Sequence, residues 1–301
     1  SIMGRVIHKK DTEQERKSGL YVISTPIGNL QDLSLRAKKI LEQCELVLAE
    51  DTRLTNKLFN SFNIDRKKKQ ILSCYRFNET QRINKLNFEK LSTCMVGLVS
   101  DAGTPSVSDP GSKIVEKYHQ LGLPVFSVPG CCSAMAGFSI SGIELKNNQT
   151  LTFGGFFPRK EKDAQKLLNK ISCGSDYVIF FETVNRLEAL LDHLERFFNE
   201  DVFVFLAKEM TKIHEATWRG NCSEILAELR ANGVKKDQFS RGELVVIINL
   251  SKQKEFLELN KEFEFWLKTL KPHVKSSVLA KILSEKFGKN RQALYSEFLK
   301  S

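Results

Sequence analysis

Short apolar runs recur through the first half of the chain, and each one ends in small or polar residues. The runs cover residues 20–23, 46–49, 95–99 and 125–128, and residues 33–41 between them have apolar side chains at helical spacing. Apolar runs of this length between turn signals are typical of buried strands. Strands that alternate with helices predict a mainly parallel sheet in an α/β fold.

The polar and glycine-containing segments all follow the predicted strands. Residues 25–29 follow the first run, Glu50 and Asp51 the second, residues 100–103 the third, and Pro129 and Gly130 the fourth. In a parallel sheet the carboxyl ends of the strands meet at one edge, where ligands bind. The sequence therefore predicts a ligand site at this edge of the first domain.

The second half has a similar mixed pattern. It begins near Leu151 and continues through predicted strands at residues 177–181, 202–207 and 243–248, with helices between them. Residues 146–149 are a polar hinge candidate. We predict a mobile tail at residues 1–18, α/β domains at 19–147 and 148–250, and a basic helical appendage at 251–301.

The appendage shows two apolar helical faces. Gly288 suits the end of the first helix and Asn290 the N-cap of the next. The first face is predicted to hold Val274, Val278, Leu279, Ile282 and Leu283, and the second Leu294, Tyr295, Phe298 and Leu299.

The formal charge of +10 is concentrated in two places. Residues 266–301 hold eight Lys or Arg against two acids, and residues 66–69 read Arg-Lys-Lys-Lys. One such run is most simply a solvated face. Two separate clusters favour a polyanionic partner, because each neutralised phosphate releases counterions.

The seven cysteines form no C-x-x-C pair and no Cys/His metal spacing. Cys131 and Cys132 are adjacent, and small apolar packing is the favoured interpretation of both. With no signal-peptide pattern and no apolar run of membrane-spanning length, we expect a reduced, cytoplasmic protein that uses no metal.

Several segments carry residue types suited to binding or acid/base chemistry. An acid at a strand end, such as Asp101, can hold a ribose or an amino group, although it can equally cap a helix. The other candidates also have a structural alternative, a surface ion pair or a helix cap, and a lone His214 is more often structural. These candidates are the pairs Asp51 with Arg53, Asn78 with Glu79, Glu182 with Arg186, and Lys208 with Glu209.

The order of these segments resembles the RsmI family of ribosomal RNA small-subunit methyltransferases, within the tetrapyrrole-methylase fold class. The resemblance covers about residues 20–250 and more loosely the helical extension. It is carried by residues 25–30, 49–53, 100–105, 108–111, 154–160 and 208–219. This chain departs from the family where a histidine is usual: it has Phe77 before Asn78, and Asn185 before Arg186. The family's Gly-Pro-Ser-Ala reads Gly-Cys-Cys-Ser-Ala at residues 130–134.

The resemblance implies a two-domain tetrapyrrole-methylase-like α/β fold with S-adenosylmethionine in the cleft between the domains, and a homodimer. It implies methyl transfer to a cytidine 2'-oxygen of 16S ribosomal RNA in the small ribosomal subunit, near the decoding centre. Carried over by position, the first domain would bind the cofactor through Ile27, Asp101, Thr104, Ser133 and Ala134. The second would add Glu182, Met210 and Gly242.

Transfer to a weakly acidic ribose hydroxyl needs a base, or a cation that stabilises the developing alkoxide. The candidates are Asp51, Glu79, Lys208 and Glu209, and the sequence does not choose between them. Asn29, Arg53, Asn78 and Arg186 are the expected RNA contacts. Two alternatives stay open: a tetrapyrrole methyltransferase on the same fold, and a non-catalytic RNA-binding ribosome-assembly factor.

Overall fold

The computed structural model describes residues 17–198, 202–231 and 242–300. The predicted tail at residues 1–18 lies almost entirely outside them. The chain divides into two compact units: Ser1–Gly137 with Glu209–Glu215, and Phe138–Lys208 with Ala216–Ser301. The two units divide after Gly137, ten residues before the boundary predicted at 147/148. The segment Glu209–Glu215, from the second half of the sequence, groups with the first unit.

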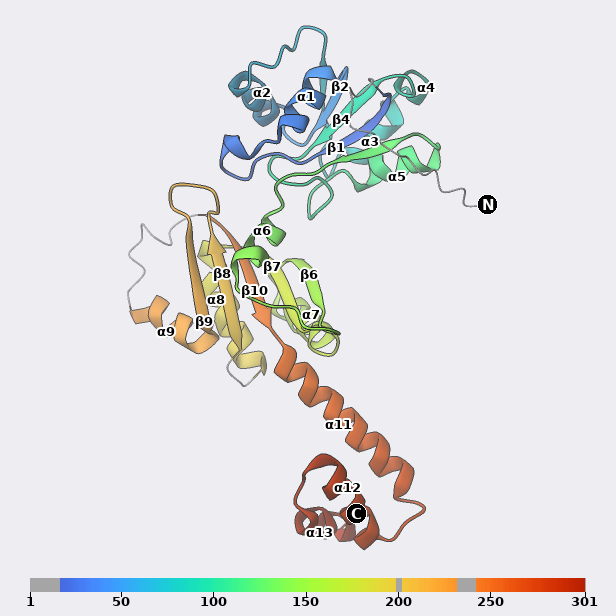
Figure 1. Cartoon of the computed structure of the whole chain (residues 1–301), viewed down its shortest axis with the longest axis vertical. Coiled ribbons are helices and arrows are strands. Elements are labelled where there is room, and N and C mark those ends of the chain that lie inside the picture. The colour runs from blue at the N-terminus through green and yellow to red at the C-terminus, as the bar shows by residue number, and fades with distance from the viewer. Residues whose placement is uncertain (1–16, 199–201, 232–241, 301) are drawn as a thin grey trace. The chain divides into compact units, whose positions relative to one another are not determined.

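Unit 1 is built on a five-stranded parallel sheet in the order β3-β2-β4-β1-β5 (Figure 1). The parallel prediction is confirmed. The strands are β1 (Gly19–Ile23), β2 (Leu46–Ala49), β3 (Gln70–Ser73), β4 (Met95–Val99) and β5 (Val125–Val128). The sequence analysis missed β3, because this short edge strand has no fully buried residue and only two apolar ones.

Helices cover both faces of this sheet. One face packs on α1 and α2 through Ala37, Leu41 and Phe59, and the other packs on α5 through Ile114 and Tyr118. The helical elements are η1 (Leu30–Asp32), α1 (Leu35–Gln43), α2 (Thr52–Ser61), α3 (Glu79–Lys85), α4 (Phe88–Leu91), α5 (Ser112–Gln120) and α6 (Ser133–Ile140). With both faces covered, every residue of β4 is buried, as the continuous apolar run indicated.

Unit 2 contains a second five-stranded sheet, in the order β6-β7-β10-β8-β9. Only β6 and β7 pair in parallel, and the other neighbours are antiparallel. Its elements are β6 (Leu151–Phe156), α7 (Glu161–Ser172), β7 (Tyr177–Thr183), α8 (Val184–Phe198), β8 (Phe203–Lys208), β9 (Ala216–Asn221), α9 (Cys222–Ala231) and β10 (Glu243–Asn249). The sequence analysis missed β9, since this edge strand carries polar residues and buries none of them fully.

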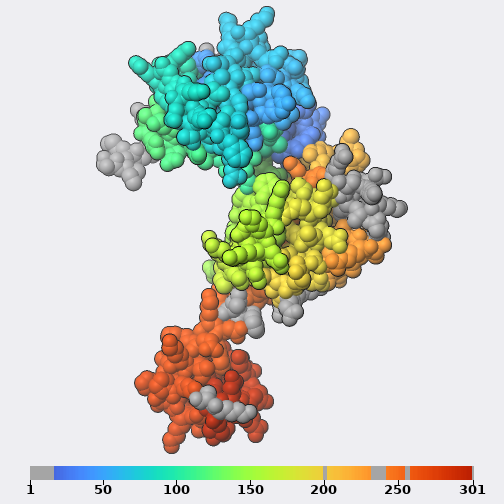
Figure 2. Space-filling model, turned by 180° about the vertical axis from the view of Figure 1, so that it is seen from behind, coloured from blue at the N-terminus to red at the C-terminus, as the bar shows by residue number. Residues whose placement is uncertain are grey.

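The chain ends in three helices, α11 (Ser251–Leu270), α12 (Ser276–Phe287) and α13 (Arg291–Lys300), which form one cluster at the red end of Figure 2. Their small core contains Phe263, Leu279, Leu283, Leu294 and Phe298. Gly288 ends α12 in the left-handed region with φ 64°, as predicted. The Asn290 side chain accepts the Ala293 N–H at 3.0 Å, which confirms the predicted N-cap.

The predicted apolar faces of α12 and α13 are too wide. Val278, Tyr295 and Leu299 are 45%, 38% and 64% exposed. Each lies one position before or after a buried residue of the same helix. A step of one residue turns a helix by about 100°, so these side chains leave the stripe that faces the core.

The first turn of α11 is joined to the sheet of unit 2 by an ion pair. Lys254 Nζ lies 2.9 Å from Asp176 Oδ2, and the Thr150 N–H donates to the same oxygen at 2.8 Å. Burial raises the pKa of Asp176, but the hydrogen bonds from Lys254 and Thr150 outweigh this, so the pKa lies below its ordinary value. Removing Lys254 would therefore leave a buried carboxylate without its cation.

None of the described helices combines the length and the apolar character needed to cross a membrane.

Candidate active site

The carboxyl ends of β1, β4 and β5 are fastened together by direct contacts. Thr25 and Gly103 form an isolated backbone bridge between the segments after β1 and β4. The Thr104 hydroxyl lies 2.8 Å from Ser24 Oγ and donates to the Cys131 carbonyl at 2.8 Å. The predicted cofactor residue Thr104 thus ties the three strand-end segments into one surface.

Asp101 connects the end of β4 to the end of β2. Its Oδ1 accepts the Asp51 N–H at 2.9 Å, and its own N–H donates to Glu50 Oε2 at 3.1 Å. Asp101 therefore holds the N-cap residue of α2 at the end of β2. Burial raises the pKa of both Asp101 and Glu50 above the ordinary values. Glu50 was missed as a site residue, although its place at a strand end was a visible signal.

Asp51 and Arg53 take the structural role considered for them. Asp51 is the N-cap of α2 and accepts the Arg53 N–H at 2.8 Å, and the Arg53 guanidinium lies 2.8 Å from the second carboxylate oxygen. The hydrogen bond from the Arg53 side chain lowers the pKa of Asp51 to about 2. A carboxylate this acidic is a weak proton acceptor near neutral pH.

The segment Glu209–Glu215 joins β8 to β9 and groups with unit 1. Gly28 lies against Lys212 and Thr211, so a Cβ at Gly28 would collide with both side chains. Met210 is buried and belongs to unit 1 in this grouping, and not to the second domain as its place in the sequence suggested. Glu209 has φ 48° and its Oε2 lies 3.1 Å from Lys212 Nζ.

A cavity of about 320 Å³ opens between α2 and the segments that follow β1 and β4. The strand-end residues Thr25, Gly28, Ser100 and Asp101 line it together with apolar side chains of α2. Small-molecule sites commonly combine apolar walls with a few polar groups in this way, in pockets upward of roughly 300 Å³. Ile27 lies beside this wall, with its Cγ2 3.4 Å from the position that a Cβ on Gly103 would take.

Residues 130–134 connect β5 to α6. Ser133 and Ala134 form the first turn of α6, and Ala134 is 2% exposed. A Cβ at Gly130 would lie only 3.0 Å from the Ser24 Cβ, which explains the glycine here. Burial raises the pKa of the Cys131 thiol, so the neutral thiol predominates and packing remains the better interpretation.

Asn78 and Glu79 follow β3 and are engaged in local structure. The Tyr75 N–H donates to Asn78 Oδ1 at 2.7 Å. Glu79 is 3% exposed, and its Oε1 accepts the Lys113 and Ile114 N–H groups at 2.9 and 3.2 Å. These two amides lie in the first turn of α5, so Glu79 caps a helix that begins more than thirty residues later in the chain.

This cap predicts how Glu79 variants will behave. Glu79→Gln keeps an oxygen acceptor and should leave the methyl transfer that the family resemblance implies within a few-fold, at a stability cost of about 1 kcal/mol. Glu79→Ala removes the acceptor and should cost about 2 kcal/mol. Urea unfolding and transfer assays on both variants test this. A folded Glu79→Gln protein with no transfer would contradict the structural role.

Unit 2 brings Glu182, Lys208 and Gly242 to one edge of its sheet. Leu244 of β10 pairs with Glu182 on one side and Lys208 on the other, so these three residues occupy one rung and face the same way. Glu182 and Lys208 are 4% and 3% exposed. The Gly242 carbonyl accepts the Val184 N–H at 3.1 Å just beyond this rung.

Glu182 retains unused hydrogen-bonding capacity. Its Oε1 accepts the Thr183 N–H at 2.8 Å, whereas its buried Oε2 has no hydrogen-bond partner in the described part of the chain. The Arg186 guanidinium lies 3.7 Å from this oxygen and donates to the Pro158 carbonyl at 3.2 Å. A buried carboxylate oxygen without a donor is costly, and a ligand N–H or O–H would satisfy it.

Among the described residues, no group of three or more His, Cys, Asp or Glu side chains is arranged to hold a metal ion.

Comparisons with known proteins identify the family. The family model of the tetrapyrrole (corrin/porphyrin) methylases matches residues 19–226. Proteins named ribosomal RNA small subunit methyltransferase I are 33% identical in Neisseria meningitidis serogroup B and 34% identical in Pasteurella multocida. Each alignment covers 92% of this chain, with 91% and 95% of the respective relative. The chain belongs to this methyltransferase I family.

Solved structures agree on the fold. This chain aligns with a diphthine synthase from Entamoeba histolytica at a TM-score of 0.52, covering 79% of this chain and 98% of the other. It aligns with a cobalamin synthesis related protein (CobF) from Corynebacterium diphtheriae at 0.51, covering 78% and 99%. Sequence identities of 16% and 14% limit this likeness to the fold. The α/β fold and the family resemblance are therefore confirmed.

Proposed function

We propose that this chain transfers a methyl group from S-adenosylmethionine to the ribose 2'-hydroxyl of a cytidine in 16S ribosomal RNA, near the decoding centre. The observation that carries the proposal is the 32–34% identity, over 92% of the chain, to ribosomal RNA small subunit methyltransferases I from several bacteria. We further propose that it works as a cytoplasmic homodimer on the small ribosomal subunit.

The residues present fit the proposed cofactor. In unit 1 the cavity has room and a mixed lining, to which Asp101 contributes among the proposed cofactor residues. In unit 2, taken by itself, Glu182 Oε2 is a buried acceptor that lacks a donor. S-adenosylmethionine would supply a methyl group activated by its sulfonium. On this proposal it is held by Ile27, Asp101, Thr104, Met210, Ser133 and Ala134 of unit 1, and by Glu182 and Gly242 of unit 2.

The chemical work left to the protein is to orient the ribose and to manage the proton of its hydroxyl. The acidity of Asp51 and the capping role of Glu79 argue against these two candidates. Lys208 and Glu209 remain. We assign to the buried Lys208 ammonium the stabilisation of the developing alkoxide, and to Glu209 the acceptance of the proton.

Arg53 and Arg186 suit RNA phosphate contacts better than Asn29 and Asn78 do. The Arg53 side chain is 86% exposed, and that of Arg186 is 30% exposed. The Asn29 side chain instead caps η1 by accepting the Gln31 N–H at 3.0 Å, and Asn78 holds its own turn. Since a guanidinium has five donors, both arginines keep capacity for phosphate beside their present partners.

The two alternatives are weaker. A tetrapyrrole substrate gains no support from the solved structures, whose 14–16% identity speaks for the fold alone. A non-catalytic assembly factor would have no use for a cavity and an unsatisfied acceptor where a cofactor is expected.

Nucleoside analysis tests the proposal directly. Incubating the protein and S-adenosylmethionine with small subunits, then digesting the RNA for mass spectrometry, should reveal 2'-O-methylcytidine. In parallel, Asp101→Ala should weaken cofactor binding in calorimetry by about tenfold or more, because the substitution removes a carboxylate that lines the pocket. Absence of methylated nucleoside with a cofactor-binding protein would refute the assigned substrate. Unchanged affinity in Asp101→Ala would mean that the cofactor pocket is misplaced.

A further inference from the structure

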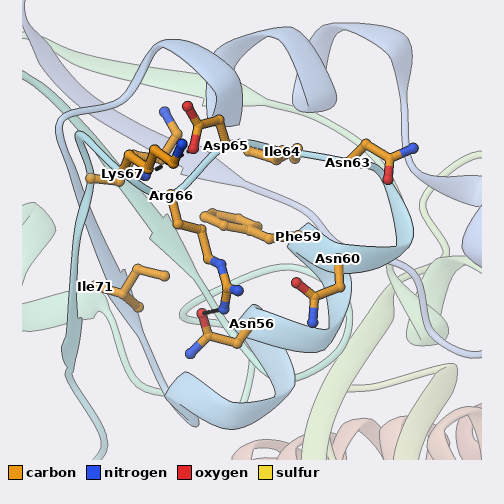
Figure 3. Close-up of a pocket in the computed structure, with 10 residues that line it drawn as sticks. Asn56, Phe59, Asn60, Asn63, Ile64, Asp65, Arg66, Lys67 and Ile71 are labelled. Carbon is orange, nitrogen blue, oxygen red and sulfur yellow. Dashed lines mark hydrogen bonds between the residues drawn. The ribbon is translucent and has the colours of Figure 1, made fainter.

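A second and larger hollow lies along the opposite face of α2. Its volume is about 800 Å³, and it is lined by Asn56, Asn60, Asn63, Arg66, Lys67 and Lys69 above an apolar floor (Figure 3). Phe59 and Ile64 of that floor are 0% and 5% exposed, so the surface that a ligand would meet is mostly polar. The hollow shares no lining residue with the cavity beside Asp101.

Its position follows from the topology of unit 1. Helix α2 begins at the carboxyl end of β2, where Asp51 caps it, and the chain enters β3 at the amino end with Gln70. Ten helical residues span about 15 Å. The hollow therefore reaches the amino-terminal edge of the sheet, on the same unit as the candidate active site but on the other face of α2.

The amides in the hollow form a stripe. Asn56, Asn60 and Asn63 are spaced four and three residues apart, which places them along one face of α2 and its extension. Asparagine is a poor helix former, so a stripe of it inside a helix costs stability. Asn63 has φ 53°, a conformation that asparagine tolerates, and Asn56 accepts a hydrogen bond from Arg66. Asn60 has neither of these local explanations.

Of the three basic residues in the hollow, Lys69 has a structural role, whereas Arg66 and Lys67 can contact a ligand. Lys69 Nζ donates to the Glu42 and Cys44 carbonyls and so caps the end of α1. Arg66 uses one guanidinium nitrogen at 2.9 Å from Asn56 Oδ1, which directs its side chain along the hollow as Figure 3 shows. Lys67 is exposed beside it.

Asp65 also lines the hollow and is the one acid there. Its Oδ1 accepts the Lys67 N–H at 3.0 Å, which shapes the turn, and this bond lowers the pKa of Asp65. With Arg66, Lys67 and Lys69 against one carboxylate, the lining remains net positive.

We propose that this hollow binds a nucleotide of single-stranded RNA, with Arg66 and Lys67 on the phosphate and Asn60 on a base edge. The proposal rests on the proposed function, since the RNA would be the substrate held away from the methylated ribose. Amides that hydrogen-bond base edges, next to cations that bind phosphate, are the chemistry with which proteins recognise unpaired RNA. A lipid surface would use the cations but not the amide stripe, and no exposed apolar anchor lines the hollow.

Three full-length variants test this. Arg66→Ala/Lys67→Ala removes two cations and leaves the Lys69 cap intact. Lys85→Ala/Lys90→Ala is the matched control, because it removes two exposed cations from the same unit outside the hollow. Asn60→Ala removes the amide without changing charge. Binding of a 16S ribosomal RNA transcript is measured at several salt concentrations without methyl donor, and thermal melting confirms that each variant folds.

The double variant in the hollow should bind RNA about tenfold more weakly near 0.1 M salt. Its slope of log affinity against log salt should flatten by roughly 0.7, the value expected for one phosphate contact of a single strand. The control should keep the parent slope. Asn60→Ala should bind RNA on the order of threefold more weakly with the slope unchanged, as expected for one uncharged hydrogen bond.

The proposal is overturned if the two double variants behave alike, or if Asn60→Ala binds like the parent. It is also overturned if the hollow variant loses affinity for phosphatidylglycerol vesicles and keeps it for RNA. Methyl transfer, assayed separately, distinguishes the two proposals. If a hollow variant transfers methyl groups and binds RNA as tightly as the parent, the proposed RNA site is refuted and the proposed enzymatic function stands. If the hollow variants lose RNA binding but the parent protein methylates no RNA, the RNA site stands and the proposed enzymatic function is refuted.

Discussion

Replacing Lys208 with methionine is expected to lower the kcat for methyl transfer by about 100-fold or more, while cofactor affinity stays near that of the parent. The side chain is 3% exposed at the end of β8, on the same rung as Glu182. A preorganised positive group in a site that excludes water stabilises developing negative charge far better than water does. Single-turnover assays with saturating RNA would measure the chemical step alone.

Methionine is chosen because it fills nearly the same volume as lysine and removes the charge together with its N–H donors. A loss of activity with an unchanged melting temperature would therefore reflect chemistry and not a cavity. Lys170→Met is the matched control, since Lys170 is an exposed lysine of α7 in the same unit. Lys208→Met that retains kcat within a few-fold would remove Lys208 from the proposed mechanism.

The sequence predicted the edge of the sheet where the strand ends meet, because a single rule applies to every strand of a parallel sheet. Each apolar run of the first half ends in a polar segment, and all strands of a parallel sheet end at one edge. Thr104 and the residues around Gly130 are in fact linked through Ser24 and Cys131, and Asp101 is linked to Glu50 and Asp51. These contacts join residues between 27 and 80 positions apart. The edge of the sheet where they meet could nevertheless be predicted without knowing which strands pair.

What the sequence could not predict depends on partners distant in the chain. Glu79 caps a helix that begins after residue 111, so its role is visible only once α3 and α5 are packed together. Met210 groups with unit 1 because the connection between β8 and β9 leaves its own sheet. That hairpin was itself hidden, since β9 is a polar edge strand with no apolar alternation to reveal it.

The other large effect should come from removing the appendage, which we expect to weaken RNA binding at least tenfold and to flatten its salt dependence. Residues 266–301 hold eight basic and two acidic residues, a balance of +6. Lys281 and Lys286 face Glu285 and Glu262 at 4.0 and 2.8 Å, whereas Lys268, Lys275 and Arg291 are exposed on the outside of the small helical core. The salt slope should fall by roughly one unit for each phosphate that the shortened protein no longer neutralises.

The structure determines where the chain should be cut. Ending it at residue 250 would remove Lys254 and leave the buried Asp176 carboxylate unpaired, so weak binding could then reflect a damaged fold. Ending it after Glu258 keeps this ion pair, and the next residue, Leu259, is 49% exposed. Cofactor affinity of the shortened protein should remain near the parent value, because the proposed pocket residues all precede the cut.

A full-length variant separates charge from packing. Lys268→Gln/Lys275→Gln/Arg291→Gln should flatten the salt slope by roughly 2 to 3 units, since three cations are removed from one surface. Lys162→Gln/Lys166→Gln/Lys170→Gln on α7 removes the same charge from exposed positions of the same unit, and should leave the slope unchanged. If the appendage serves only to stabilise a dimer, shortening the chain will change the mass measured by light scattering, and the charge variants will bind RNA as the parent does. Removing lysine or arginine side chains that contact phosphates must reduce the number of counterions released on binding. An unchanged salt slope in the appendage variant would therefore show that these three residues do not contact RNA phosphates.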